Sequence, residues 1–329
     1  MEKQFFDLPL PTRISQQNIY DIYCDNYDSI HYLFVEFQFS WLQQAYKSLK
    51  DIDKYNILVF LYKENFMELN ELFKVKSLNQ FYINPRFNLD KINIIQISQK
   101  LRLSKETTRR KILELEKSLI IKKDKKEIII TKYGLEVQRP AASIKSFTKL
   151  LSRFSRLLVE NNILKKDVTP DEFEKIIKNN FTQFWHYFYE FQIPYLLKWK
   201  KYFGELEKWI VVGSLAYNQN LVFRNNRKDI IDNISFGKNM LDQIANLKNV
   251  QGLNAMTISD LSGIPRPTVL RKLNSLIKSK HATKDKKNLY TVTKNNVRLK
   301  ELDRMRYSTV KEISLLLSKY FNFIIQTRT

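Results

Sequence analysis

The chain has 329 residues, of which 56 are Lys or Arg and 34 are Asp or Glu, giving a formal net charge of +22. Its hydrophobic content of 43% supports about two domains of ordinary size and excludes a disordered tail. The positive charge favours a polyanionic partner such as nucleic acid. Cys24 is the single cysteine, which excludes an intrachain disulfide and a thiolate metal cluster.

The start of the chain and its longest apolar run bear on location. The first residues, MEKQFFDLPLPTR, lack the continuous apolar core of a signal peptide, and the apolar run at 209–217 is too short to span a bilayer. A lone cysteine suits a reducing interior. We therefore expect a soluble cytoplasmic protein, associated with the nucleoid, that has no membrane partner.

Aromatic helices open each half of the chain. The sequence predicts a long aromatic-rich helix over 28–50 and a second apolar helix over 53–65. Similar text predicts two further helices over 182–203 and 205–217, the first of them kinked or ended by Pro194. Aromatic stripes of this kind are typical of a packed core, between helices or between two halves.

Residues 97–130 predict two short helices and a hairpin. Ile97 and Leu101 belong to the first, supporting helix. Ser104 is placed to cap the second helix, whose inward side consists of Thr108, Ile112 and Leu115. The segment IIKKDKKEIIITK that follows reads as a strand, a charged turn and a β-branched strand. The remaining polar residues are left outside or near the rim: Lys105, Thr107, Arg109, Arg110 and Lys111.

The same pattern returns 161 residues later without a gap. The tetrapeptide KDKK stands at 123–126 and again at 284–287, and EFQ at 36–38 recurs at 190–192 with a spacing of 154. Similarity at several places in one order predicts a duplicated domain, with a first repeat at 1–165 and a second at 166–329. A new helix begins near this boundary, where Thr169 caps, Pro170 takes the first position and Glu172 closes a capping box.

In the second copy, glycine and proline mark the ends of the predicted helices more clearly. Gly263 suits the left-handed turn between its two helices, and Pro265 and Pro267 suit the start of the second helix. The apolar side of that helix is expected to consist of Val269, Leu273 and Leu276. Its opposite, cationic side is expected to consist of Arg266, Thr268, Arg271 and Lys272.

The stretches IPRPTVLRKLNSLI with YTVT, and LSKETTRRKILELEKS with EIIIT, resemble winged helix-turn-helix regulators of bacteria, of the MarR and IclR groups. The resemblance covers about 91–134 and 252–296. It implies that the second helix of each motif enters the DNA major groove while the wing touches the backbone. The implied recognition-helix residues are Lys105, Thr107, Arg109, Arg110, Lys111, Arg266, Thr268, Arg271 and Lys272. The implied wing contacts are Lys123, Lys125, Lys126, Lys284, Lys286 and Lys287.

Two departures from the family pattern concern glycine. Family members place Gly where the recognition helix ends, whereas this chain has Ser118 with Leu119 and Ser279 with Lys280. The first copy also has Arg102 where the second has Gly263. These differences either alter the geometry of the turn or favour one half as the stronger DNA reader.

Helices after each hairpin give a reason for duplication. MarR-like proteins dimerise through terminal helices, so the resemblance implies a mainly α, pseudo-two-fold dimer within one chain that reads two DNA half-sites. Further homodimerisation and a small-molecule effector stay open. The apolar stripes of these helices are Phe147, Leu151, Phe154 and Leu158, and Ile313, Leu316, Leu317, Tyr320 and Ile324.

Other functions fit less well. His31, His186 and His281 stand far apart without metal-ligand spacing, and no phosphate-binding glycine motif occurs, so we expect neither an enzyme nor a cofactor. Two alternatives stay open. One is a plasmid or phage replication initiator with tandem winged helices, and the other is a winged-helix protein-interaction scaffold.

Overall fold

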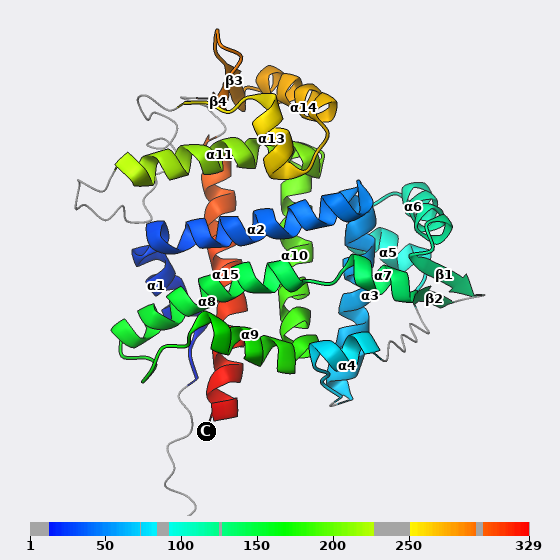
Figure 1. The fold of residues 1–329 in the computed structure, drawn as a ribbon, viewed down its shortest axis with the longest axis vertical. Coiled ribbons are helices and arrows are strands. Elements are labelled where there is room, and N and C mark those ends of the chain that lie inside the picture. Colours follow the sequence, from blue (N-terminus) through cyan, green and yellow to red (C-terminus); the bar gives the residue numbers. More distant parts are fainter. Residues whose placement is uncertain are drawn as a thin grey trace, which may run out of the picture.

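The computed structural model describes residues 13–72, 74–83, 92–124, 127–226, 251–293 and 299–328. The fold is mainly helical, with two small antiparallel hairpins (Figure 1). None of the described helices is both long and apolar enough to cross a membrane.

Six helices recur as two sets of three with one spacing. The first set is α1 (Gln16–Asp25), α2 (Tyr27–Leu49) and α3 (Ile52–Glu71), and the second is α9 (Pro170–Asn179), α10 (Phe181–Phe203) and α11 (Leu206–Asn226). Each helix of the second set begins 154 residues after its counterpart, the spacing of the repeated EFQ. The predicted long aromatic helices are therefore confirmed.

The N-termini of these helices are specified locally. Asp51 caps α3 by accepting from the backbone N–H of Lys54, and Thr169 and Glu172 form the predicted capping box of α9. The prediction that Pro194 could end α10 is wrong, because the helix continues through it to Phe203. Pro194 lies on the exposed side of α10, and aromatic packing on the buried side stabilises the helix despite the hydrogen bond that proline cannot donate.

Aromatic side chains fill the centre where α2, α3, α10 and α11 meet. Trp41 and Tyr55 pack edge to face with ring centroids 5.1 Å apart, and Tyr195 and Trp209 do the same at 5.5 Å. Each residue of the second pair lies 154 positions after a residue of the first, with Tyr and Trp exchanged. The two halves thus use the same packing site with swapped ring sizes.

Two helices that follow the hairpins close the core. They are α8 (Ala141–Glu160) and α15 (Leu299–Arg328), and α15 packs against α1 as α8 packs against α9. Phe147 meets Tyr320 at 5.2 Å and Phe154 meets Phe321 at 5.8 Å. The predicted apolar stripes are buried on both helices, and each half of the chain crosses onto the other.

Two hairpin units sit at the edge of this helical body. The first consists of α5 (Ile94–Leu101), α6 (Lys105–Lys117), β1 (Ile121–Asp124) and β2 (Glu127–Ile130), and α7 (Lys132–Val137) follows it in the chain. The short helix α4 (Leu78–Ile83) precedes it in the chain and packs on α9 and α10. The second consists of α13 (Ala255–Ser262), α14 (Arg266–Lys278), β3 (Ala282–Lys284) and β4 (Tyr290–Val292). Helices α13 and α14 match α5 and α6 end for end at a spacing of 161.

Candidate nucleic-acid interface

Both hairpin units build their turn in the same way. Arg102 ends α5 and Gly263 ends α13, each in the left-handed region, with φ of 50° and 72°. The hydroxyl of Ser98 donates to the carbonyl of Leu103 at 2.8 Å, and that of Ser259 donates to Ile264 at 2.6 Å. These serines were not among the predicted residues, although their alignment at the spacing of 161 could have identified them.

The inward sides of α6 and α14 follow the prediction. Ser104 caps α6 by accepting from the N–H of Thr107, whereas α14 starts after Pro265 without a side-chain cap. The predicted apolar positions of both helices are buried: Thr108, Ile112, Leu115, Val269, Leu273 and Leu276. Both helices are therefore fixed in rotation, which decides what faces outward.

Lys111 and Lys272 do not face outward, so this part of the prediction is wrong. They are 7% and 3% exposed, each on the side of its helix that packs on the body. Lys111 Nζ lies 2.5 Å from Asp51 Oδ2, and Lys272 pairs with Glu205. Because the two carboxylates lie at the N-terminal ends of α3 and α11, 154 residues apart, the same kind of ion pair fastens each recognition-helix candidate to the body.

The neighbouring lysines lower the pKa of both carboxylates in these pairs. Burial opposes the charge on Asp51, but the hydrogen bond from Lys111, the N–H of Lys54 and both ammonium groups lower its pKa. Burial likewise opposes the charge on Glu205, and Lys272 with Lys208 lowers its pKa. Both carboxylates are therefore held ionised beside a lysine that cannot also reach a ligand.

The outward cations of the first unit have acidic neighbours on their own helix. Arg109 lies 4.0 Å from the exposed Glu106, and Arg110 lies 4.0 Å from the half-buried Glu114, which Lys54 approaches more closely, at 3.3 Å. Lys105 is also exposed, whereas Thr107 is half-buried and takes part in the cap. Exposed pairs of this kind contribute at most about 1 kcal/mol, so both guanidinium groups can reorient towards a ligand.

The outward side of α14 carries no acidic residue. Arg266 and Arg271 are exposed, and neither forms an ion pair with any residue that the structure describes. Thr268 is half-buried beside them. The second unit therefore presents the less compensated positive surface.

The hairpins carry the predicted lysines at their exposed tips. Lys123, Lys284, Lys286 and Lys287 are exposed, while Lys125 and Lys126 lie outside the described residues. In the second hairpin Asp285 accepts from the N–H groups of Lys287 and Leu289, both at 2.8 Å. In the second hairpin, Asp285 therefore shapes the turn, while Lys286 and Lys287 are exposed beside it.

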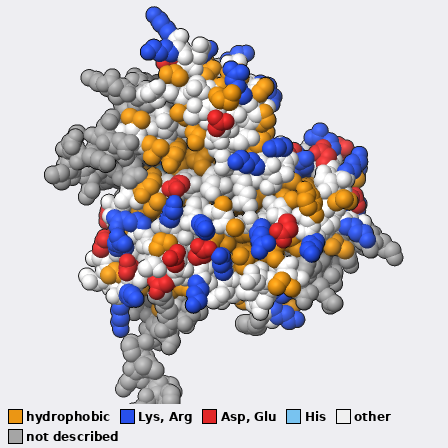
Figure 2. Space-filling view, in the orientation of Figure 1, with side chains coloured by type: hydrophobic (Ala, Val, Ile, Leu, Met, Phe, Trp, Pro, Cys, Tyr) orange, Lys and Arg blue, Asp and Glu red, His pale blue; other side chains and the backbone are white. Residues whose placement is uncertain are grey.

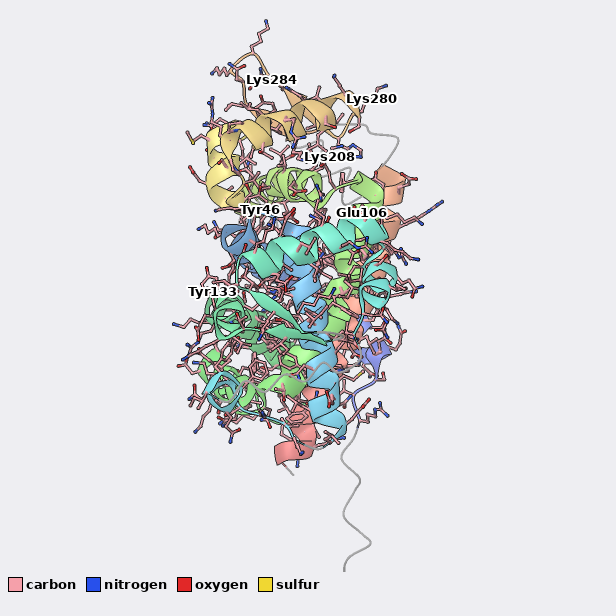
Figure 3. The ribbon with its side chains drawn as sticks, turned by 90° about the vertical axis from the view of Figure 1, so that its right-hand side faces the viewer. Tyr46, Glu106, Tyr133, Lys208, Lys280 and Lys284 are labelled. Carbon is pink, nitrogen blue, oxygen red and sulfur yellow. The ribbon has the colours of Figure 1, made fainter. Side chains whose placement is uncertain are left out.

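In Figure 1 the second unit lies at the top of the molecule and the first at its right-hand side. Figure 3 views the molecule from the right-hand side of Figure 1. In this view the second unit, with Lys280 and Lys284, lies above and α6, with Glu106, lies below, while the end of α2 at Tyr46 lies between them. Lys and Arg side chains also gather on both units in the space-filling view (Figure 2). Lys47 and Lys50, exposed at that end of α2, were missed from the sequence because nothing but their charge marks them.

Comparison with known protein families, curated proteins and solved structures finds no match to this chain. Among the described residues, no group of three or more His, Cys, Asp or Glu side chains could hold a metal ion. The proposed function therefore depends on the positions of the exposed charged side chains alone.

Proposed function

We propose that this chain is a transcription regulator that binds specific double-stranded DNA sequences, with α6 and α14 as recognition helices and the two hairpins as wings. Each half would form a winged helix-turn-helix, and the two halves would form a MarR-like dimer within one chain. A pseudo-two-fold axis would then relate the two recognition helices, as in dimers that bind two half-sites.

Reciprocal contacts support the two-fold relationship. Gln38 and Gln192, from the repeated EFQ, exchange side-chain hydrogen bonds of 2.9 Å in the interior. The pairs α1 with α15 and α9 with α8 repeat one contact in both directions. Self-complementary contacts of this type are what a two-fold axis requires.

The observation that carries the DNA proposal is the shared exposure of cations on α6 and α14. Their exposed side chains are Lys105, Arg109 and Arg110 on one helix and Arg266 and Arg271 on the other. Both helices are visible from the direction of Figure 3. Arginine can bind the edge of guanine with two hydrogen bonds, while hairpin lysines suit phosphate. A scaffold that binds protein would have less use for cations at both places.

The two halves should contribute unequally. Glu106 and Glu114 lie beside the arginines of α6, and a carboxylate facing DNA phosphate is repelled, whereas α14 has no acidic residue. We therefore assign the larger share of the binding free energy to the second unit.

Salt dependence tests this proposal directly. If both units together neutralise about 8 phosphates, the logarithm of the duplex association constant should fall against the logarithm of salt concentration with a slope near −7. Fluorescence anisotropy with a labelled duplex measures the slope, and no dependence on salt would reject DNA binding. Sequencing genomic DNA that co-purifies with the protein then separates promoter sites from a replication origin.

A further inference from the structure

The two hairpin units dock differently against the long helix of the opposite half. The second unit is closed onto α2: Gln43 donates through Nε2 to the carbonyl of Asp260 at 3.1 Å. A Cβ placed on Gly263 would lie 3.4 Å from Cγ of Lys47, an ordinary contact distance. The stem of Lys47 therefore lies directly against this turn.

The first unit stands away from α10 instead. A cleft of about 1340 Å³ separates α5 from α10, and its lining includes Gln99, Leu197 and Lys201, which lie at the repeat positions of Asp260, Gln43 and Lys47. The space that is closed in one half is open in the other. A cleft of this size exceeds the 300–1,000 Å³ or so typical of small-molecule sites.

Charge and bulk explain why this cleft is open. Arg102 stands where the second unit has Gly263, and it faces a cleft that Lys201 and Lys100 also line. These three cations are exposed, and none forms an ion pair within the described part of the chain. Like charges on both walls oppose closure.

The other charged residues of the cleft are already engaged or at its edge. Lys198 pairs with Glu312 at 2.8 Å and Lys63 with Glu64 at 3.0 Å. Glu190 pairs with Lys319 at 2.6 Å, and the exposed Glu301 is the remaining carboxylate. The cations without a partner therefore exceed the free carboxylates.

Arg102 adopts a left-handed backbone conformation, with a φ of 50°, where a residue with a Cβ costs about 1–2 kcal/mol. Glycine occupies the same position of the second unit without that cost. The side chain of Arg102 is exposed at the cleft and forms no ion pair with the described residues, so its guanidinium group is available to an anion from outside the chain.

We propose that the cleft between α5 and α10 binds phosphate groups through Arg102, Lys100 and Lys201. Guanidinium and ammonium groups on opposite walls neutralise a phosphate from two sides, and an anion between them removes the repulsion that opposes closure. The phosphates come from the backbone of bound DNA or from a small phosphorylated ligand. Only the first source rests on the proposed function.

Inorganic tripolyphosphate and a DNA duplex, titrated separately into the full-length protein, test the proposal. The double variant Arg102→Gly with Lys201→Ala should bind at least one of the two probes tenfold or more weakly. Lys175→Ala, at an exposed position of α9 outside the cleft and both hairpin units, is the control and should bind both probes within twofold of the unaltered protein. Thermal unfolding checks that all three proteins are folded.

The pattern of losses identifies the source. Weaker duplex binding assigns the cleft to the DNA backbone, and weaker tripolyphosphate binding alone assigns it to a small ligand. If the double variant binds both probes as the unaltered protein does, or if Lys175→Ala loses as much, the proposal is overturned. Because tripolyphosphate is measured without DNA, this arm decides even if no duplex binds.

Discussion

Gln38 and Gln192 each donate a side-chain hydrogen bond to the other, both of 2.9 Å, and neither residue is more than 2% exposed. They lie 154 residues apart, the spacing that relates α2 to α10. A residue that pairs with its own repeat counterpart lies on or near an axis of approximate two-fold symmetry. The polar contact is thus satisfied only when the two halves meet in one register.

Replacing one member of this pair should be more harmful than replacing both. Gln38→Leu leaves the amide of Gln192 buried without its partner, which costs about 1–3 kcal/mol of unfolding free energy. The double variant with Gln192→Leu removes both amides and should recover most of that loss. Urea unfolding of the two single variants and the double variant measures the coupling, and purely additive losses would contradict a mutual pair.

Neighbouring cations on α14 should have opposite roles. Arg271→Ala should weaken binding to a specific duplex by about 1–3 kcal/mol while leaving thermal unfolding unchanged, because Arg271 is exposed. Lys272→Ala should lower the unfolding free energy by about 2 kcal/mol, between the values for exposed and buried ion pairs, because Glu205 loses its partner.

Anisotropy with specific and random duplexes separates these roles. Equal losses on both duplexes would make Arg271 a phosphate contact and remove it from base recognition. Unchanged stability in Lys272→Ala would show that its ion pair does not hold α14 to the body.

The spacing of apolar residues in the sequence predicted most of the helices and the sides on which they are buried. Apolar spacing predicted the inward sides of α6 and α14 because burial of one helix face leaves a direct pattern in the sequence. The same spacing wrongly assigned Lys111 and Lys272 to the exposed side of their helices. A lysine at the edge of an apolar face can extend its stem inward when a carboxylate lies within reach of its ammonium group. Their partners Asp51 and Glu205 belong to distant segments, so the local sequence pattern could not predict these ion pairs.

The sequence also could not predict that the second hairpin unit is closed onto α2 while the first is separated from α10 by a cleft. Alignment of the repeats shows that Arg102 replaces Gly263, but not which helix each turn faces. That depends on how α2 and α10 cross, which is set by aromatic packing across the whole centre. Similarity between repeats predicts shared contacts better than it predicts where the repeats differ.

Glu207 should make stability depend on pH. Burial raises the pKa of its carboxyl, with Glu205 and Asp53 adding to the effect and Lys272 and a backbone hydrogen bond opposing it. Because the folded pKa lies above the unfolded one, ionisation penalises the folded state, and stability is gained as pH falls through the folded pKa.

Glu207→Gln should therefore raise the melting temperature at pH 7 by about 2 °C, the effect of somewhat under 1 kcal/mol in a chain this long. The gain should vanish below the unfolded pKa of about 4.3, where both proteins are neutral at this position. Scanning calorimetry at pH 7 and pH 4 makes the comparison, and a gain that is equal at both values would rule out ionisation as its cause.

A small residue within α11 predicts a stabilising change. Gly213 lies at the repeat position of the fully buried Val59, and a Cβ there would meet only Phe39, at 3.4 Å, an ordinary contact. Gly213→Ala should add about 1 kcal/mol to the unfolding free energy, because alanine favours the helix over glycine by that amount. Val59→Gly, the reverse change at the matched site, should be destabilising, since it loses helix propensity and leaves a cavity. Urea unfolding measures both, and a loss of stability in Gly213→Ala would show that Phe39 cannot accommodate the methyl group.

Leu119 should be replaceable by glycine with a gain in stability. It follows the end of α6 with a φ of 57° and is 72% exposed, so its side chain gives up little packing. Leu119→Gly removes the steric cost of the left-handed conformation, and we expect a net gain of about 0.5–1 kcal/mol, less than the full cost because glycine makes the unfolded chain more flexible. Gly263→Ala, which forces a Cβ into the same conformation at φ 72°, should lose a similar amount. Thermal unfolding of the two variants provides the comparison: a loss in Leu119→Gly would mean that the exposed leucine stabilises the folded chain through contacts that outweigh its backbone strain.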